Sequence, residues 1–109
     1  MSRSTARVVT DRPQRYAKQL ASHLSRRSQT SWDEESGEGT ITFSDGKGTM
    51  TATEGALLLT VDADDEHLEL FEGVIGRHLV RFGTKDELVV KWERDNGQAG
   101  TEQRKAEED

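Results

Sequence analysis

The chain has 109 residues, no cysteine and a formal net charge of −6 at neutral pH. The lack of cysteine excludes disulfides, thiolate zinc sites and thiol catalysis. Only 31% of the residues are hydrophobic, so part of the chain must lie outside the core. The acidic balance also argues against general nucleic-acid binding, which depends on phosphate neutralisation.

Composition predicts one folded part with an unstructured segment at each end. Residues 95–109 are almost entirely polar, charged or glycine, and they bury too little surface to offset their ordering entropy. We expect a flexible N-terminus over residues 1–6, a single α+β domain over residues 7–94 and a disordered acidic tail over residues 95–109. No apolar run has signal-peptide or bilayer-spanning length, which predicts a soluble, cytoplasmic protein.

The first third of the chain predicts a helix with a basic exposed side. Residues 6–9 suit a short edge strand. Thr10 or Asp11 is then expected to cap a helix that has Pro13 in its first turn and runs to about Arg26. The apolar stripe at helical spacing comprises Tyr16, Ala17, Leu20, Ala21 and Leu24. Residues 1–31 carry seven basic groups and one acidic group, a net of +6, which predicts either a solvated helix face or a local anion-facing patch.

The period changes to two between residues 29 and 62. Strands are expected near residues 30–33, 40–44, 49–53 and 56–61, with an Asp45-Gly46 hairpin turn, and together they form a four-stranded antiparallel meander. The residues expected to face inward are Ile41, Phe43, Met50, Leu57, Leu59 and Val61. Threonines dominate the other sheet face. Leu58 and Val89 are apolar exceptions there, and they would offer a contact patch for a partner or a second copy.

Residues 62–83 predict the best-bounded helix in the chain. Asp62 or Asp64 is expected to cap the N-terminus of this helix. Gly83 is expected to end the helix in the left-handed conformation that glycine adopts easily. Its buried stripe comprises Leu68, Phe71, Ile75, Leu79 and Phe82, with Val74 at the margin. A last strand over residues 87–93 places Leu88, Val90 and Trp92 on one face. It is expected beside the Trp32 strand or, alternatively, beside the Val61 strand.

These elements predict an α+β fold, a two-layer sandwich. We expect an antiparallel sheet of about five strands, with both helices on one face.

Two histidines are candidate site residues. His78 lies on the apolar side of the second helix and His23 at the edge of the first helix's stripe. If both helices pack on one sheet face, the two imidazoles can meet. Zinc takes three or four protein ligands, so the pair falls short of a metal site. We expect hydrogen-bonded structural histidines, with neither a metal nor another cofactor.

Arg77 and Arg81 are candidate ligand-binding residues on the exposed flank of the second helix. They lie four residues apart, a spacing at which a guanidinium pair can clamp a phosphate or carboxylate. Gly73 and Gly76 are unusual inside a helix, where each costs about 1 kcal/mol relative to alanine. They are expected to permit close approach of the other helix or of a ligand.

The sequence contains no recognised catalytic motif. It has no nucleophile elbow, phosphate-binding loop or dinucleotide fingerprint. The main hypothesis is therefore a non-enzymatic binding or interaction module. Its partner would be a protein or a small anionic ligand, with no membrane association, and the chain would be a monomer or a weak homodimer.

The sequence resembles the bacterial family called domain of unknown function 2218. The matching residues are Thr10-Asp11-Arg12-Pro13, Tyr16, Lys18-Gln19-Leu20, Ser22-His23-Leu24, Trp32, Gly76-Arg77-His78-Leu79, Arg81-Phe82-Gly83, Glu87-Leu88 and Trp92. The resemblance implies a two-layer fold similar to the TATA-binding-protein-like architecture, and it implies no activity. Members occur near siderophore or iron-uptake genes, which suggests as an alternative an accessory role in iron handling with a metal, haem or small anion. Members often carry a second histidine shortly after the position of His23, where this chain has Ser25-Arg26-Arg27 instead.

Overall fold

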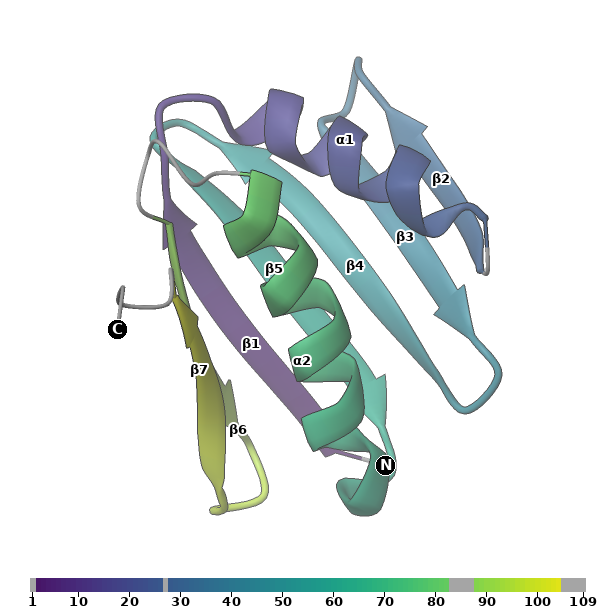
Figure 1. The fold of residues 1–109 in the computed structure, drawn as a ribbon, viewed down its shortest axis with the longest axis vertical. Helices are drawn as coiled ribbons and strands as arrows, with labels where there is room; N and C mark the ends of the chain where they lie inside the picture. Colours follow the sequence, from purple (N-terminus) through teal and green to yellow (C-terminus); the bar gives the residue numbers. More distant parts are fainter. Residues whose placement is uncertain (1, 27, 83–87, 105–109) are drawn as a thin grey trace.

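A computed structural model shows an α+β fold in which two helices cover one face of an antiparallel sheet (Figure 1). It describes residues 2–26, 28–82 and 88–104. The elements in chain order are β1 (Ser2–Val9), α1 (Pro13–Leu24), β2 (Gln29–Asp33), β3 (Glu38–Phe43), β4 (Gly46–Thr53), β5 (Ala56–Ala63), α2 (Asp65–Phe82), β6 (Val89–Arg94) and β7 (Ala99–Arg104).

The sheet has seven strands in the order β2-β3-β4-β5-β1-β6-β7. The four-stranded meander β2–β5 is confirmed by its antiparallel pairing. The expectation of about five strands is wrong, because β1 and β7 are additional members. Both expected positions of the last strand are also wrong. β6 pairs with β1, which lies between β5 and β6 in the sheet. The likeness to the TATA-binding-protein architecture stays a prediction.

The expected flexible N-terminus is wrong for residues 2–6, which belong to the central strand β1. This strand pairs with β5 along its whole length, from Ser2 opposite Ala63 to Val9 opposite Ala56. Its inward side chains are Ser4, Ala6 and Val8, which are all buried. Serine and alanine are too small or polar to give a strand-like hydrophobic alternation, so local sequence indicated only a short edge strand over residues 6–9 and not the longer central strand.

The expected disordered tail is likewise wrong for residues 99–104, which form β7. Residues 95–98 connect β6 to β7, and β7 pairs with β6 at the edge of the sheet. The strand is polar, but its half-buried side chains have polar partners. Thr101 donates to a buried carboxylate of α2, and the Gln103 carbonyl accepts from the Trp92 indole. Residues 105–109 lie outside the described part of the chain.

Both predicted helices are present with shorter bounds. α1 begins at Pro13 after an N-cap residue, Arg12, that makes no side-chain capping bond, so neither Thr10 nor Asp11 caps it. Thr10 instead accepts a hydrogen bond from the Arg12 amide at 3.1 Å. α2 begins at Asp65, one residue after Asp64. Because Asp62 and Ala63 still belong to β5, Asp62 is not the N-cap of α2. The expected helix end at Gly83 lies outside the described residues.

The core between the helices and the sheet contains the predicted stripes. The α1 stripe and most of the α2 stripe are buried, while Phe43, Phe82 and Val74 pack against the core and are partly buried. Leu88, Val90 and Trp92 are also buried as predicted. Across the described ranges, neither helix is long and apolar enough to cross a membrane.

Among the residues that the structure describes, one charged side chain, Glu72 of α2, is fully buried. Arg94 of β6 donates to both of its carboxylate oxygens at 2.9 Å. Ser4 of β1 donates to Glu72 at 2.5 Å, and the Thr101 hydroxyl of β7 donates at 2.8 Å. The Thr101 amide adds a fourth donor group at 3.2 Å. A buried carboxylate is tolerated when it is paired and hydrogen-bonded, so Glu72 links α2 to three strands.

Burial and hydrogen bonding shift the pKa of Glu72 in opposite directions. Burial by itself would raise the pKa of the carboxyl group, because desolvation penalises the charged form. Hydrogen bonds from Arg94, Ser4 and Thr101 outweigh burial and lower the pKa below its ordinary value. Glu72 is therefore ionised at neutral pH and balances the charge of Arg94.

The two glycines of α2 have different neighbours from those expected. A Cβ on Gly76 would collide with the Gln103 side chain of β7. A Cβ on Gly73 would lie 2.5 Å from the guanidinium of Arg77. The sequence predicted that the other helix or a ligand would approach these glycines closely. At Gly76 it is instead the edge strand β7 that comes close. Gly76 allows Gln103 to reach the Trp92 indole, whose N–H donates to it at 2.7 Å.

Replacing Glu72 should destabilise the fold strongly. Glu72→Ala leaves the Arg94 guanidinium buried without its partner, so we expect a loss of about 3–5 kcal/mol in the free energy of unfolding. Urea denaturation measures it. The double replacement Glu72→Met with Arg94→Met should cost less than Glu72→Ala. Equal losses in the two variants would contradict the account of an unpaired buried charge.

The ion pair should also make stability pH-dependent in acid. A carboxyl group with a lowered pKa contributes stability above its ordinary pKa of about 4.3, and this contribution is lost as the pH falls through the folded value. Urea titrations at a series of acid pH values should show a steeper loss for the natural chain than for Glu72→Gln. Parallel curves would contradict the lowered pKa.

Gly76 and Gln103 should show strong energetic coupling. Gly76→Ala displaces Gln103 and breaks its bond to Trp92, so the substitution should destabilise the chain despite a gain of about 1 kcal/mol in helix propensity. With Gln103→Ala already present, the same substitution should be neutral or stabilising. A double-mutant cycle by thermal unfolding measures the coupling. If the effects of Gly76→Ala and Gln103→Ala on stability were additive, the proposed contact between the two residues would be contradicted.

Candidate functional site

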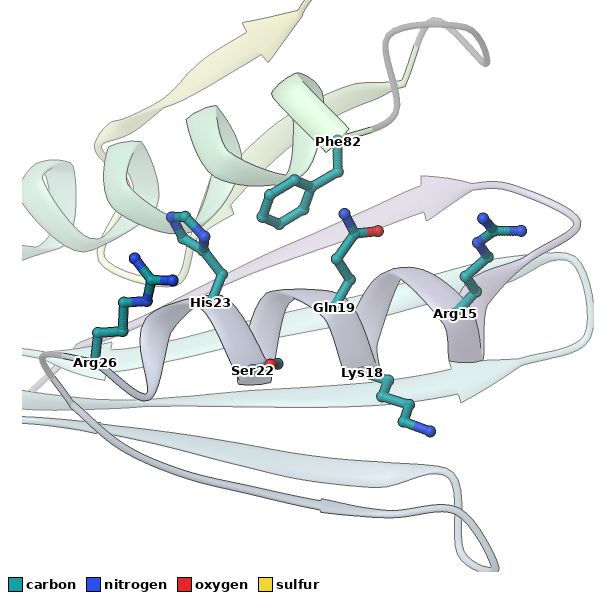
Figure 2. A pocket seen from close by; sticks show the side chains of 7 residues that line it. All are labelled: Arg15, Lys18, Gln19, Ser22, His23, Arg26 and Phe82. Atoms are coloured by element: carbon teal, nitrogen blue, oxygen red, sulfur yellow. The ribbon is translucent and has the colours of Figure 1, made fainter.

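A basic hollow lies along the exposed side of α1, against the C-terminal end of α2. Its volume is about 490 Å³, and its lining comprises Arg15, Lys18, Gln19, Ser22, His23, Arg26 and Phe82. Figure 2 shows Arg15 and Arg26 at opposite ends, with His23 and the Phe82 ring facing each other between the two helices. The helical repeat explains this arrangement, because residues 15, 19, 22 and 23 share one side of α1 and Arg26 follows in the turn after the helix.

The structure brings His23 and His78 together beside this hollow. Their ring centroids are 4.8 Å apart, and the His23 ring contacts Phe82 edge-on at 5.3 Å. His78 Nδ1 lies 2.6 Å from the Val74 carbonyl oxygen. A carbonyl only accepts, so Nδ1 carries the proton, and Nε2 of the neutral ring is an acceptor. His78 thus has the expected structural bond and also meets His23.

The environment of His23 disfavours its charged form. Desolvation is the largest cause that lowers its pKa, followed by electrostatic interactions with His78, Arg26 and Arg81. His23 is therefore mainly neutral at pH 7. An anion placed among these cations would offset their repulsion and favour protonation of the ring.

The predicted arginines have separate locations. Arg81 lies close enough to His23 to affect its protonation. The Arg77 guanidinium lies over Gly73. Neither Arg77 nor Arg81 is among the residues lining the hollow. The structure therefore groups Arg81 with both histidines and leaves Arg77 aside.

Arg15, Gln19 and Arg26 belong to the hollow but were not singled out from the sequence. The net charge of the first 31 residues was the available signal, but it does not say which cations lack acidic partners. Lys18 pairs with Glu34 at 3.0 Å. Within residues 2–26, 28–82 and 88–104, neither Arg15 nor Arg26 forms an ion pair.

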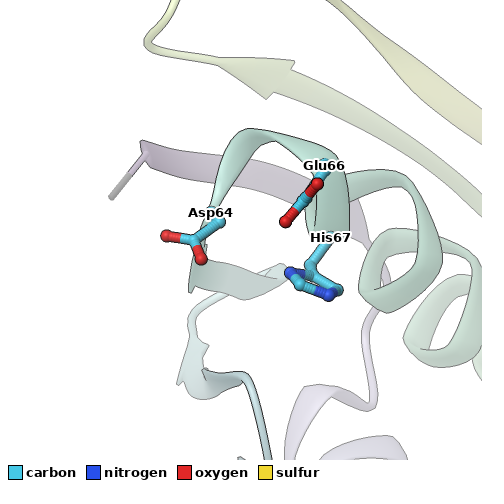
Figure 3. Close-up of side chains that lie close together, drawn as sticks. All are labelled: Asp64, Glu66 and His67. Carbon is cyan, nitrogen blue, oxygen red and sulfur yellow. The ribbon is translucent and has the colours of Figure 1, made fainter.

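A second polar cluster lies at the start of α2. Ligand-type atoms of Asp64, Glu66 and His67 lie within 4.8 Å of one another (Figure 3). Acidic groups at this end complement the helix dipole, and the His67 amide donates to the Asp64 carbonyl at 2.8 Å. These interactions are typical of a helix N-terminus and account for the cluster, so we assign it no ligand. Among the described residues, no third metal-ligating side chain joins His23 and His78.

Fold and site together define a small two-layer α+β protein with a basic hollow on its helical layer. Residues 5–93 match the family described as "Uncharacterized protein conserved in bacteria" (DUF2218). The chain belongs to this family, as the sequence resemblance indicated. The family description names no activity. It gives no support to the iron-handling alternative, which we do not pursue.

A solved relative has the same fold. The NMR structure of PA4090 from Pseudomonas aeruginosa superimposes with a TM-score of 0.72 at 24% sequence identity, covering 93% of this chain and 100% of that one. At this identity the likeness establishes the fold alone. No curated protein matches the chain in sequence.

Proposed function

We propose that the protein is a non-enzymatic binding module that captures a small phosphate-bearing anion in the hollow between α1 and the end of α2. The observation that carries the proposal is the grouping of two adjacent imidazoles with Arg15 and Arg26, two cations without an acidic partner among the described residues. Concentrated, uncompensated positive charge favours an anion, and planar guanidinium groups suit phosphate oxygens.

The dimensions of the hollow support a small ligand. A volume of about 490 Å³ falls within the range of roughly 300–1,000 Å³ typical of small-molecule sites. Arg15 and Arg26 at the two ends would contact separate charged groups, and Phe82 would form an apolar wall (Figure 2). The family match names no reaction. Among the described residues, Ser22 is the one hydroxyl side chain that lines the hollow, and it forms no hydrogen bond to His23, which favours binding over catalysis.

Removing a cation from the hollow should weaken anion binding. With inorganic pyrophosphate as the probe, Arg26→Ala or Arg15→Ala should raise the dissociation constant by about tenfold, as expected for loss of a charge-assisted hydrogen bond. Isothermal titration calorimetry measures it. Arg77→Ala is the matched control, since it removes the same charge from α2 outside the hollow. Equal weakening by all three variants would indicate nonspecific charge attraction and refute the site.

Anion binding should strengthen as the pH falls. The pKa of His23 is lowered in the free protein, and a bound anion stabilises the protonated ring, so affinity should rise as the pH decreases through and below about 6.5. Sulfate is a suitable probe because it does not titrate in this range. Chemical-shift titrations of the natural chain and of His23→Gln should show a clear pH dependence only in the natural chain. The same pH dependence in both would contradict the role of His23.

A further inference from the structure

Within the described part of the chain, nothing covers the sheet face opposite the helices, and three exposed apolar side chains lie on it. Val9, Leu58 and Val89 are exposed by 69%, 37% and 41% respectively. Figure 1 shows both helices on the other face. A depression of about 380 Å³ crosses β1, β5 and β6 on the uncovered face, and its lining includes Arg7, Leu58 and Lys91.

Strand register places opposite charges at the two ends of one row across this face. Arg7 lies opposite Leu58, and Leu58 lies opposite Thr51. Thr51 in turn lies opposite Glu38, and Glu38 opposite Asp33. The row therefore runs from a base through Leu58 and Thr51 near its centre to two acids.

Lys91 extends this row on its basic side. It lines the depression together with Arg7 and lies on β6, the neighbour of β1. Within the described residues, Arg7, Lys91 and Glu38 form no ion pair with their own chain. Lys91 has the acidic Glu102 of β7 opposite it, and Glu102 itself pairs with Arg104. Arg7 and Glu38 are therefore the charges of opposite sign that are fully available to a partner.

We propose that the uncovered sheet face binds a second copy of this chain, face to face, about a twofold axis that runs along the strands between β4 and β5. Such an axis reverses the strand order. β1 and β3 lie equally far from it on opposite sides, as do β6 and β2. Arg7 then faces Glu38 of the second copy, and Lys91 faces Asp33 of the second copy. Leu58 meets Thr51 at the centre, as an isologous interface requires.

Neighbouring rows are compatible with the same axis. Asp62 and Lys47 lie opposite each other on the two strands that flank it, so Lys47 of each copy faces Asp62 of the other. Between these rows lies a row of hydroxyl side chains around Thr60 and Thr49, with one charged member, Glu93 of β6. The same axis places Glu93 against the neutral Ser31 of the second copy. No like charges face each other in the three rows, and this complementarity favours a second copy over a partner of a single charge sign.

The geometry also tolerates the usual twist. Packed sheets keep their strand directions within about 30°. Arg7 and Glu38 lie about one and a half strand spacings, or roughly 7 Å, from the axis, so this rotation moves them by only a few ångströms. Six strands offer roughly 500 Å² per copy. About 1,000 Å² in total is at the low end for specific interfaces, which predicts a weak dimer.

Reversing the charge of Arg7 or of Glu38 tests the proposed contact between these two residues across the dimer interface. Sedimentation velocity over a concentration series should show a monomer–dimer equilibrium for the natural chain. Arg7→Glu or Glu38→Arg alone should raise the dissociation constant by at least about tenfold, because each places like charges together at two symmetric positions. An equimolar mixture of the two variants should form a heterodimer, since both of its contacts are again between opposite charges. The double variant Arg7→Glu/Glu38→Arg should dimerise as the natural chain does.

Control variants separate this interface from other associations. Glu69→Arg reverses an exposed charge on α2, in the helical layer, and should leave dimerisation unchanged. A natural chain that stays monomeric at all concentrations would overturn the proposal. A dimer that persists in both single variants, as edge-to-edge strand pairing would, overturns it as well. Circular dichroism of each variant excludes unfolding as the cause of a lost dimer.

Discussion

The buried carboxylate of Glu72 is the constraint on which the rest of the structure depends. Its four donor groups come from three strands, and they fix α2 against the β1-β6-β7 side of the sheet. Gly76, one turn further on, admits the Gln103 side chain from the same side. α2 is thus held by polar contacts along one flank and by its apolar stripe beneath. The remaining flank faces α1, where His78 meets His23.

The sequence predicted those elements whose hydrophobic pattern is strong and local. The meander β2–β5 alternates clearly, and both helices carry long apolar stripes. β1 was underestimated because Ser4 and Ala6 fill two of its inward positions. β7 was missed because its half-buried side chains, Thr101 and Gln103, are polar. Their partners Glu72 and Trp92 lie 29 and 11 residues away, and no local period contains that information.

The candidate site was predictable only in part for the same reason. Periodicity placed His23 and His78 on facing sides of their helices, and their proximity followed once both helices packed on one sheet face. Which cations are neutralised depends on loop positions. Glu34 in the β2–β3 connection reaches back to Lys18, whereas Arg15 and Arg26 have no such partner among the described residues. Charge counting along the chain cannot separate these cases.

The two-layer architecture separates the two proposed surfaces. The basic hollow lies on the helical layer, and the complementary charge row lies on the uncovered sheet face (Figure 1). Pairing through the sheet faces would therefore leave both hollows directed outward, on opposite sides of the dimer. Neither surface shares a residue with the other. Binding at one would alter the other only through the sheet between them, which the Glu72 contacts make rigid on the α2 side, so we expect the two hollows of a dimer to bind anions independently.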